Sequence, residues 1–540
     1  MNFATIDYVV FAFYAALVMG VGLWVSRSKA GHERNAEDYF LAGKTLPWWA
    51  IGSSLIASNI SAEQFIGMSG SGFAIGLGIA TYEWMAAVTL LVVAKFFLPI
   101  FLKKGIFTMP QFLEVRYDNR VRTAMAVFWL LLYVFVNLTS VLYLGALALK
   151  TIMGVDLTIA IVGLALFAVL YSLAGGLTAV AWTDVIQVIF LVIGGLVTTY
   201  LGLQAVGMGE GVIAGFQRLI ELAPEKFDMI FSKDATYTDI ATGELKSAYA
   251  LLPGISVLVG GMWIANLNYW GCNQYIIQRT LGADLSTARK GILFAAFLKL
   301  LIPVIVVLPG ISAFVLYSEG VFQQEMLDAN GTVKPDFAYP TLLNLLPVGM
   351  KGLAFAALIA AVVASLAGKA NSVGTIFSLD IYKRYFDREA SDAKLVRVGK
   401  IAIAVSMLIA IVVAPLLRSL EQTYQFIQEY MSFITPGAFA IFLLGMFWRR
   451  TTSAAALAAA LLTIPLSAAF KFFAPGIPFL DRLGWVFALI VALMVAMSLT
   501  QKKESEAIEI DPKLFRVEPS FVVGGVIICG ILAALYTVFW

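Results

Sequence analysis

Long apolar runs are the feature that most limits how this chain of 540 residues can fold. A helix needs roughly 20 apolar residues to cross a membrane, and fourteen runs are close to that length or exceed it. They occupy residues 5–25, 48–69, 75–98, 122–151, 157–173, 180–204, 252–277, 291–317, 348–381, 401–417, 426–447, 453–473, 484–499 and 521–540. Lipid offers no partners to backbone N–H and C=O groups, so the runs are expected to be helices. The sequence therefore predicts an all-α membrane protein.

The charged residues indicate how these spans are oriented. Only 13% of the residues are charged, and most of the 37 lysines and arginines lie in the odd-numbered connections between spans. Such connections face the cytoplasm, because positively charged loops are retained on that side. Both termini and the long connections 207–250 and 318–347 are then external. We expect a multi-pass protein of the plasma (inner) membrane.

Two spans are interrupted by polar residues and glycines at matching places. In span 48–69 such residues crowd the stretch from Gly52 to Gln64, and in span 252–277 they run from Gly260 to Gln274. Five spans separate the starts of the two. Interrupted spans at corresponding positions in two halves are typical of transporters built from inverted repeats, where freed carbonyls and helix ends bind substrate and ion at the midplane. The alternative is close packing of small residues between helices.

A few ionisable residues lie inside or at the ends of the spans, where charge is costly and usually functional or paired. Glu83 and Lys299 can compensate each other across a water-filled site, while Asp184 and Glu429 are expected closer to the interfaces. The polar set holds amides, hydroxyls, one carboxylate and one ammonium, beside aromatic rings, but no mid-span arginine. That mixture favours a neutral, polyhydroxylated solute over a carboxylate, which would prefer an arginine.

Other classes of function fit poorly. The single histidine, His32, lies in a charged connection, and no nucleophile–base pair or metal-ligand cluster is visible, so an enzyme is not expected. The net charge of +3 gives no reason to expect nucleic-acid binding. A transporter-like sensor would need a signalling domain, and the longest cytoplasmic segments, such as 501–519, are too short for a kinase.

Six motifs resemble those of a known family. They are EDYFLAGK at 37–44, ASNISAEQFIG at 57–67, YEWM at 82–85, VNLTS at 136–140, GGL to WTDVIQ at 175–187, and YWG to QYIIQRT at 269–280. On these motifs the chain is identified as a member of the sodium/solute symporter family, on its sodium/glucose–galactose branch. The resemblance runs nearly from end to end.

The resemblance implies a LeuT-like fold of 14 transmembrane helices. A core of two inverted five-helix repeats would follow one extra helix and precede three more. The corresponding segments are an N-terminal helix and cytoplasmic loop at 1–46, a first repeat at 47–206, an external loop at 207–250, a second repeat at 251–447 and three C-terminal helices at 448–540.

The resemblance also implies the residues that contact a sugar and close its site. The expected sugar contacts are Gln64, Glu83, Asn137, Asn266, Lys299 and Gln428. Tyr269 would close the inner side by stacking, and the outer gate would be formed by Met68, Tyr82 and Tyr424. Relatives that bind sugar carry a serine three residues after the glutamate that corresponds to Glu83, whereas this chain has Ala86 there. One hydroxyl partner for the sugar is therefore lost, and the resemblance does not decide which sugar epimer is preferred.

For sodium, the resemblance implies the carbonyls of Ala57, Ile60 and Ala361 and two adjacent serine hydroxyls. This chain has Ala364 followed by Ser365, so one ligand is missing. Lys369, one helical turn after Ser365, stands where relatives usually carry an apolar residue. Two interpretations stay open: Lys369 extends to the cytoplasmic vestibule and sodium still binds, or its ammonium reaches the site and replaces the ion. Asp184 is a candidate for the ion path.

The expected function is sodium-coupled import of a monosaccharide such as glucose or galactose by alternating access, with sodium as the co-transported ion. The alternative is a sodium-independent or proton-linked transporter of a sugar or of a polyol such as inositol, in which Lys369 replaces the ion. The sequence does not decide the oligomeric state.

Overall fold

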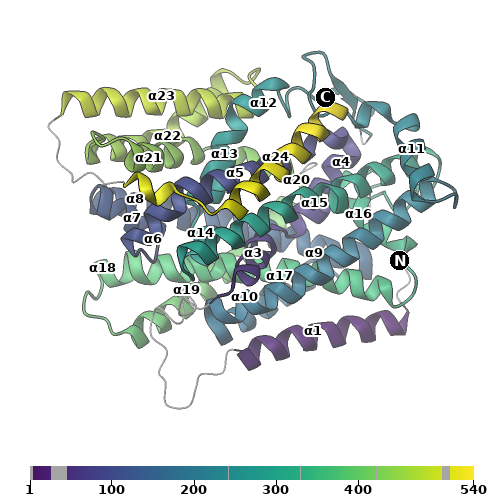
Figure 1. The fold of residues 1–540 in the computed structure, drawn as a ribbon. Helices are drawn as coiled ribbons and strands as arrows, with labels where there is room; N and C mark the ends of the chain where they lie inside the picture. Colours follow the sequence, from purple (N-terminus) through teal and green to yellow (C-terminus); the bar gives the residue numbers. More distant parts are fainter. Residues whose placement is uncertain (1–3, 26–45, 241, 329, 420–422, 502–510) are drawn as a thin grey trace.

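The protein is a bundle of membrane-length helices, described by a computed structural model for residues 4–25, 46–240, 242–328, 330–419, 423–501 and 511–540. The motif at 37–44 lies outside these residues. Figure 1 shows α1 along one edge of the bundle and α22 and α23 along the opposite edge. Within the described part of the chain, ten helices are long and apolar enough to cross a membrane, or eleven if one bent pair counts as a span.

The first half of the chain holds the broken helix 48–69 and its neighbours. Its α-helices are α1 (Thr5–Val25), α3 (Trp48–Asn59), α4 (Ser69–Ile75), α5 (Thr81–Val92), α6 (Leu98–Lys104), α7 (Met109–Arg116), α8 (Asn119–Leu132), α9 (Thr139–Met153), α10 (Leu157–Val206) and α11 (Val212–Leu222). Between them lie the π-helical segments η2 (Glu63–Met68), η4 (Val93–Phe97) and η5 (Tyr133–Leu138), and the 3₁₀ turns η3 (Gly76–Ala80) and η6 (Pro224–Lys226).

The second half repeats the pattern of a broken helix followed by long ones. Its α-helices are α12 (Ile255–Val259), α13 (Gly261–Cys272), α14 (Gln274–Thr280), α15 (Leu285–Ser318), α16 (Ala338–Leu342), α17 (Met350–Ile376), α18 (Lys383–Tyr385), α19 (Asp392–Val413), α20 (Thr423–Met431), α21 (Thr435–Phe447), α22 (Ser453–Phe473), α23 (Phe479–Thr500) and α24 (Pro519–Val538). The shorter segments are η7 (Pro335–Phe337), η8 (Leu343–Leu345), η9 (Phe377–Tyr382), η10 (Ala414–Ser419) and η11 (Pro512–Phe515).

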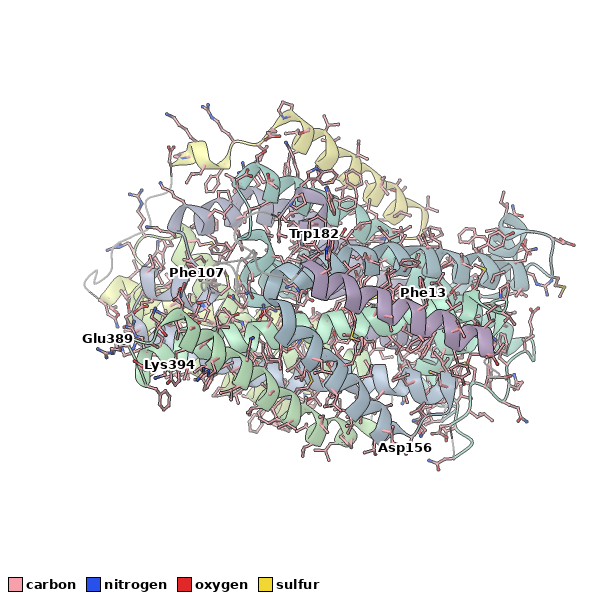
Figure 2. The ribbon with its side chains drawn as sticks, turned by 90° about the horizontal axis from the view of Figure 1, so that it is seen from below. Phe13, Phe107, Asp156, Trp182, Glu389 and Lys394 are labelled. Atoms are coloured by element: carbon pink, nitrogen blue, oxygen red, sulfur yellow. The ribbon has the colours of Figure 1, made fainter. Side chains whose placement is uncertain are left out.

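The structure differs from the predicted spans at two places. The connection expected at 174–179 has helical backbone, so spans 157–173 and 180–204 form the single helix α10. Glycine lowers helix propensity by only about 1 kcal/mol, and the pair Gly175–Gly176 does not end the helix. Figure 2 shows α10 running from Asp156 and changing direction close to Trp182. The span predicted at 426–447 is divided into α20 and α21, which meet at 49°.

The number of spans depends on how the interrupted helices are counted. The helices α3 and α13 have 12 residues each, and the apolar stretch Leu157–Leu170 is also shorter than a full span. These three pieces correspond to predicted spans that do not reach membrane length by themselves. The predicted total of fourteen therefore stays a prediction.

The long connection 207–250 lies at one end of the bundle (Figure 1). It contains a small antiparallel hairpin, β1 (Thr236–Thr238) with β2 (Leu245–Ser247), in which Tyr237 pairs with Lys246. Its Lys226 donates a hydrogen bond to the Ala74 carbonyl at 2.6 Å and lies over the Phe314 ring. Burial lowers the pKa of the Lys226 ammonium to about 8. Lys226 thus fixes the connection to the end of α4 and to α15.

The interior of the bundle is formed by α3, α10, α15 and α17. The helix α10 packs against α17, α3 and α15, and α15 packs against α3, α4 and α5. The broken helix α3–η2 is therefore enclosed by long helices from both halves of the chain. The extra helix α1 packs on the outside, against α10 and α17.

Asp7 joins α1 to the N-terminus of α17. Its buried carboxylate accepts hydrogen bonds from the backbone N–H of Gly349 at 2.7 Å and of Gly352 at 2.9 Å. The first N–H groups of a helix have no partner within it, and a carboxylate satisfies both these groups and the helix dipole.

We expect Asp7→Ala to lower the free energy of unfolding by about 1–3 kcal/mol, because two buried amides lose their acceptor. Thermal melting of the detergent-solubilised protein measures this change, with Glu221→Ala as an exposed control in α11. Equal melting temperatures of Asp7→Ala and the control would show that Asp7 does not hold α1 in place.

Candidate functional site

The helix that begins at Trp48 stops in the middle of the bundle. After Asn59 the backbone turns extended at Ile60, with φ −78° and ψ 119°, and resumes as the π-helical segment η2. The Gln64 Oε1 accepts a hydrogen bond from the backbone N–H of Ser61 at 2.9 Å, and the Ser61 Oγ accepts one from the N–H of Glu63 at 3.1 Å. Side chains cap the new start, while carbonyls of the last α3 turn lack helical partners.

The second interrupted helix breaks at Asn273. This residue is extended, with φ −92° and ψ 128°, between α13 and α14. The Tyr133 hydroxyl of η5 fixes the break, because it donates to the Asn273 side chain and accepts from the backbone N–H of Gln274 at 3.0 Å. Both polar, glycine-containing spans are thus broken, as the sequence predicts.

A polar cavity lies between the two broken helices, and its lining joins elements far apart in sequence. All six residues expected to contact sugar line this cavity: Gln64, Glu83, Asn137, Asn266, Lys299 and Gln428. The structure also adds Asn59, Glu63 and Asn268 from the broken helices, while Ala86 lines the cavity where relatives place a serine. A π-helical segment carries Gln64, and another carries Asn137; such bulges often mark functional sites.

Opposite charges meet at one wall of this cavity. The Lys299 Nζ of α15 forms an ion pair with Glu83 of α5 and a hydrogen bond with the Asn59 Oδ1. The Lys299 and Glu83 side chains are only 1% and 4% exposed. The Lys299 Nζ also lies 4.9 Å from the Trp270 ring centroid. The structure therefore pairs the two intramembrane charges as the sequence predicts, and Asn59 extends the pair to α3.

Aromatic rings bound the cavity on two sides. Tyr82 and Tyr424 meet edge to face, with ring centroids 5.5 Å apart. Tyr269 packs edge to face on Trp270, and its hydroxyl accepts hydrogen bonds from Asn59 Nδ2 at 3.0 Å and from the Tyr275 hydroxyl at 2.6 Å. All three tyrosines expected at the gates line the cavity.

Met68, the fourth residue expected at a gate, lies elsewhere. It is fully buried in the core at the end of η2 and does not line the cavity. Its role at the outer gate stays a prediction.

The residues expected to bind sodium lie on α3, on the extended residue that follows it and on α17, and the two helices pack against each other. Ala57, Ile60 and Ala361 are buried, and the Ser365 Oγ donates a hydrogen bond to the Ser58 carbonyl at 3.3 Å. Carbonyl and hydroxyl oxygens are the ligands that a hard cation prefers. This set of oxygen donors fits sodium, and the Ser58 carbonyl beside the break in α3 contacts α17.

Lys369 does not extend to the cytoplasmic vestibule. Its Nζ donates a hydrogen bond to the Ser365 Oγ at 2.9 Å and lies 3.5 Å from Glu63 Oε2. The Lys369 side chain is 1% exposed, and the Ser140 Oγ donates to the other carboxylate oxygen of Glu63 at 2.6 Å. This geometry differs from the interpretation in which the ammonium points away from the ion site.

Sequence reasoning missed Glu63 as a functional residue. The signal was present, because an ammonium buried in a membrane helix needs a counter-charge. Glu63 is an acidic residue on the interrupted segment itself, but spacing in the sequence does not reveal that η2 lies beside α17. Its carboxylate lines the cavity and also holds Lys369, so it joins the two candidate sites.

Asp184, the candidate for the ion path, is enclosed by protein. It is fully buried in α10, where it accepts a hydrogen bond from the Ser54 Oγ at 2.5 Å and lies 3.9 Å from the Arg279 guanidinium. The helix α10 continues through the segment predicted as a connection, so Asp184 lies within a helix and not at the start of one. Its role in an ion path stays a prediction.

Two broken helices around a polar cavity, in a bundle of membrane-length helices, are typical of integral membrane transporters. The family model of the sodium:solute symporter family matches residues 39–463. The chain belongs to that family.

Related proteins and structures agree with this assignment. The chain is 51% identical to the sodium/glucose cotransporter of Vibrio parahaemolyticus, over 99% of this chain and 98% of the relative. It is 35% identical to sodium/myo-inositol cotransporter 2 of Mus musculus, over 85% of this chain and 69% of the relative.

Two solved structures share the fold at low sequence identity. A Na⁺-coupled sialic acid symporter in a substrate-bound outward-open state superposes with a TM-score of 0.79 at 24% identity, covering 94% of this chain and all of that one. Mhp1, a nucleobase-cation-symport-1 family transporter, gives a TM-score of 0.54 at 15% identity, covering 88% of this chain and 98% of that one.

We expect Lys299→Met to lower the free energy of unfolding by about 3–5 kcal/mol, because removing one partner leaves a buried carboxylate without its counter-charge. Thermal melting in detergent measures the change. Lys290→Met, which breaks an exposed pair with Glu518, is the control. The double variant Glu83→Gln/Lys299→Met should recover part of the loss, whereas an additive loss would argue against an energetic pair.

Proposed function

We propose that the protein is a sodium-coupled symporter that imports a monosaccharide such as glucose or galactose by alternating access. The observation that carries the proposal is the break in α3–η2, which contributes both to the polar cavity and to the cation ligand set. The relative from Vibrio parahaemolyticus, a sodium/glucose cotransporter, is 51% identical over almost the whole chain.

The chemistry of the cavity supports a neutral, hydroxyl-rich solute. Amide side chains present donors and acceptors together, and the Glu83–Lys299 pair offers charge-assisted bonds to hydroxyls without a net charge. Among the lining residues there is no arginine to hold a carboxylate. The Trp270 and Tyr269 rings supply apolar surface for the carbon face of a sugar ring.

Sodium would act at the same break. A cation held by the carbonyls of Ala57, Ile60 and Ala361 and the Ser365 hydroxyl would join α3 to α17, favouring the conformation in which the sugar site is assembled. Its energetic contribution is large enough for accumulation. A tenfold sodium gradient supplies about 1.4 kcal/mol and 100 mV about 2.3 kcal/mol per charge, together sufficient for several-hundredfold accumulation.

We infer that the membrane arrangement is that of a 14-helix, LeuT-like protein with both termini external. The two interrupted helices would open the inverted repeats 47–206 and 251–447, with the loop 207–250 between them. Helix 5–25 would precede this core, after which 448–540 would supply three more helices. The position of α1 and of α22 and α23 at opposite edges of the bundle supports this arrangement (Figure 1).

A second candidate is favoured by the position of Lys369. Because its ammonium contacts Ser365, it would replace the ion in a sodium-independent or proton-linked transporter of a sugar or polyol. Inositol is the alternative solute, and the chain is 35% identical to a mouse sodium/myo-inositol cotransporter.

Uptake of radiolabelled sugar into proteoliposomes separates these functions. We expect an inward sodium gradient to raise the initial rate and to drive glucose or galactose above equilibrium, with inositol as the competing substrate. A potassium gradient of equal size is the control. Equal rates and no accumulation with either cation would refute symport with sodium.

Restoring the missing hydroxyl tests the sugar site. We expect Ala86→Ser to tighten binding of the sugar epimer that reaches the new hydroxyl about fivefold, since a neutral hydrogen bond contributes about 1 kcal/mol. Competition binding with glucose and galactose measures the ratio of dissociation constants. Ala87→Ser, at the next buried position of α5, is the control. An unchanged ratio would place the sugar away from Ala86.

A further inference from the structure

The Glu63–Lys369 ion pair lies between the cation ligand set and the sugar cavity. The Lys369 ammonium is held by two acceptors, the Ser365 Oγ at 2.9 Å and Glu63 Oε2 at 3.5 Å, and lies over the Tyr275 ring with its Nζ 5.5 Å from the centroid. On the other side, the Glu63 carboxylate lines the cavity and is fixed by Ser140. No other pair in the described structure touches both sites.

The ammonium and the cation share one ligand. The Ser365 hydroxyl donates its proton to the Ser58 carbonyl and accepts a hydrogen bond from Lys369. A hydroxyl oxygen has two lone pairs, so only one is left for a metal ion. A cation that binds here competes with the ammonium for Ser365, and it also meets a fixed positive charge beside it.

Glu63 decides how strong that competition is. Its negative charge compensates Lys369, so the pair together adds little net charge to the ion site. The nearby Arg279 is engaged with Ser54 and Asp184 and forms a separate ionic cluster. Without Glu63, the buried ammonium would have only Ser365 and the ion ligands as acceptors.

We propose that Lys369 is a tethered competitor of sodium and that Glu63 restrains it, so that the pair sets the sodium affinity of the transporter. In the pair, Glu63 draws the ammonium toward the cavity. When sodium takes Ser365, the ammonium moves fully onto the Glu63 carboxylate, which borders the sugar site next to Gln64. Binding of the ion is thereby transmitted to the sugar cavity. This inference rests on the proposed sodium-coupled function and adds the residues that tune it.

Charge-neutral variants of each partner test the pair, alone and together. The half-saturating sodium concentration is measured twice, for sugar uptake in proteoliposomes and for equilibrium binding of radioactive sodium to the purified protein. The variants are Lys369→Met, Glu63→Gln and Glu63→Gln/Lys369→Met, with Lys394→Met in an exposed pair with Asp387 as the control.

The two single variants should shift the half-saturating sodium concentration in opposite directions. We expect Lys369→Met to lower it at least tenfold, because Ser365 is freed and an uncompensated carboxylate remains. We expect Glu63→Gln to raise it at least tenfold or to abolish sodium binding. The double variant should lie within about threefold of the wild type, and the control should be unchanged. If a single variant does not fold, the neutral double variant still tests the inference, because it leaves no buried charge of the pair uncompensated.

Other outcomes overturn the inference. One such outcome is that sodium stimulates the wild type, but the single variants change the half-saturating sodium concentration by less than twofold or in the same direction. That outcome contradicts the role of Lys369 as a tethered competitor and leaves the proposed function standing. If a single variant does not fold and the double variant lies outside threefold of the wild type, the inference also fails. If sugar uptake by the wild-type protein does not depend on sodium, both the proposed function and this inference are wrong.

Discussion

The interruption of one membrane helix between Asn59 and Glu63 is the constraint on which the rest of the site depends. A continuous helix would satisfy its own backbone groups and leave nothing for a ligand. The backbone becomes extended at Ile60. The Ser58 carbonyl just before it accepts a hydrogen bond from Ser365 of α17, and Glu63 and Gln64 after it line the polar cavity. The break is possible because Ser61 and Gln64 satisfy the new helix start and because long helices of both halves enclose it. The expected ion ligands Ala57 and Ile60 and the cavity-lining residues Glu63 and Gln64 are thus neighbours on one backbone segment.

Charge compensation across the two halves of the chain is the second organising principle. A single charge inside a membrane protein is costly, whereas a pair with additional hydrogen bonds is tolerated. In each buried pair or cluster around the break, one partner comes from the first half and the other from the second: Glu83 with Lys299, Glu63 with Lys369, and Asp184 with Arg279. Hydrogen bonds link α3 to two of these pairs: Asn59 bonds Lys299, and Ser54 bonds Asp184. Any movement that separates these helices must therefore break charge pairs.

Hydrophobic run length and local chemistry sufficed for much of the fold. Helices α1 and α22 have the predicted bounds, because each corresponds to a single, mainly apolar run of about membrane length. The breaks at Ile60 and Asn273 also follow from local sequence, since glycine and polar side chains weaken a membrane helix there. The continuity of α10 did not follow, because the pair Gly175–Gly176 lowers hydropathy and helix propensity together without ending the helix.

The sequence by itself determined a polytopic helical protein with two interrupted helices, two buried charges that need each other, and, through its motifs, a set of sugar and sodium residues. Tertiary structure alone decided which groups meet. It enclosed the six predicted sugar contacts in one cavity, moved Asp184 into the interior and left Met68 out of the cavity wall. It also paired Lys369 with Glu63, a residue 306 positions earlier whose partner no local pattern identifies. Periodicity and composition describe the environment of a residue, whereas the packing of distant helices decides which charge lies opposite it.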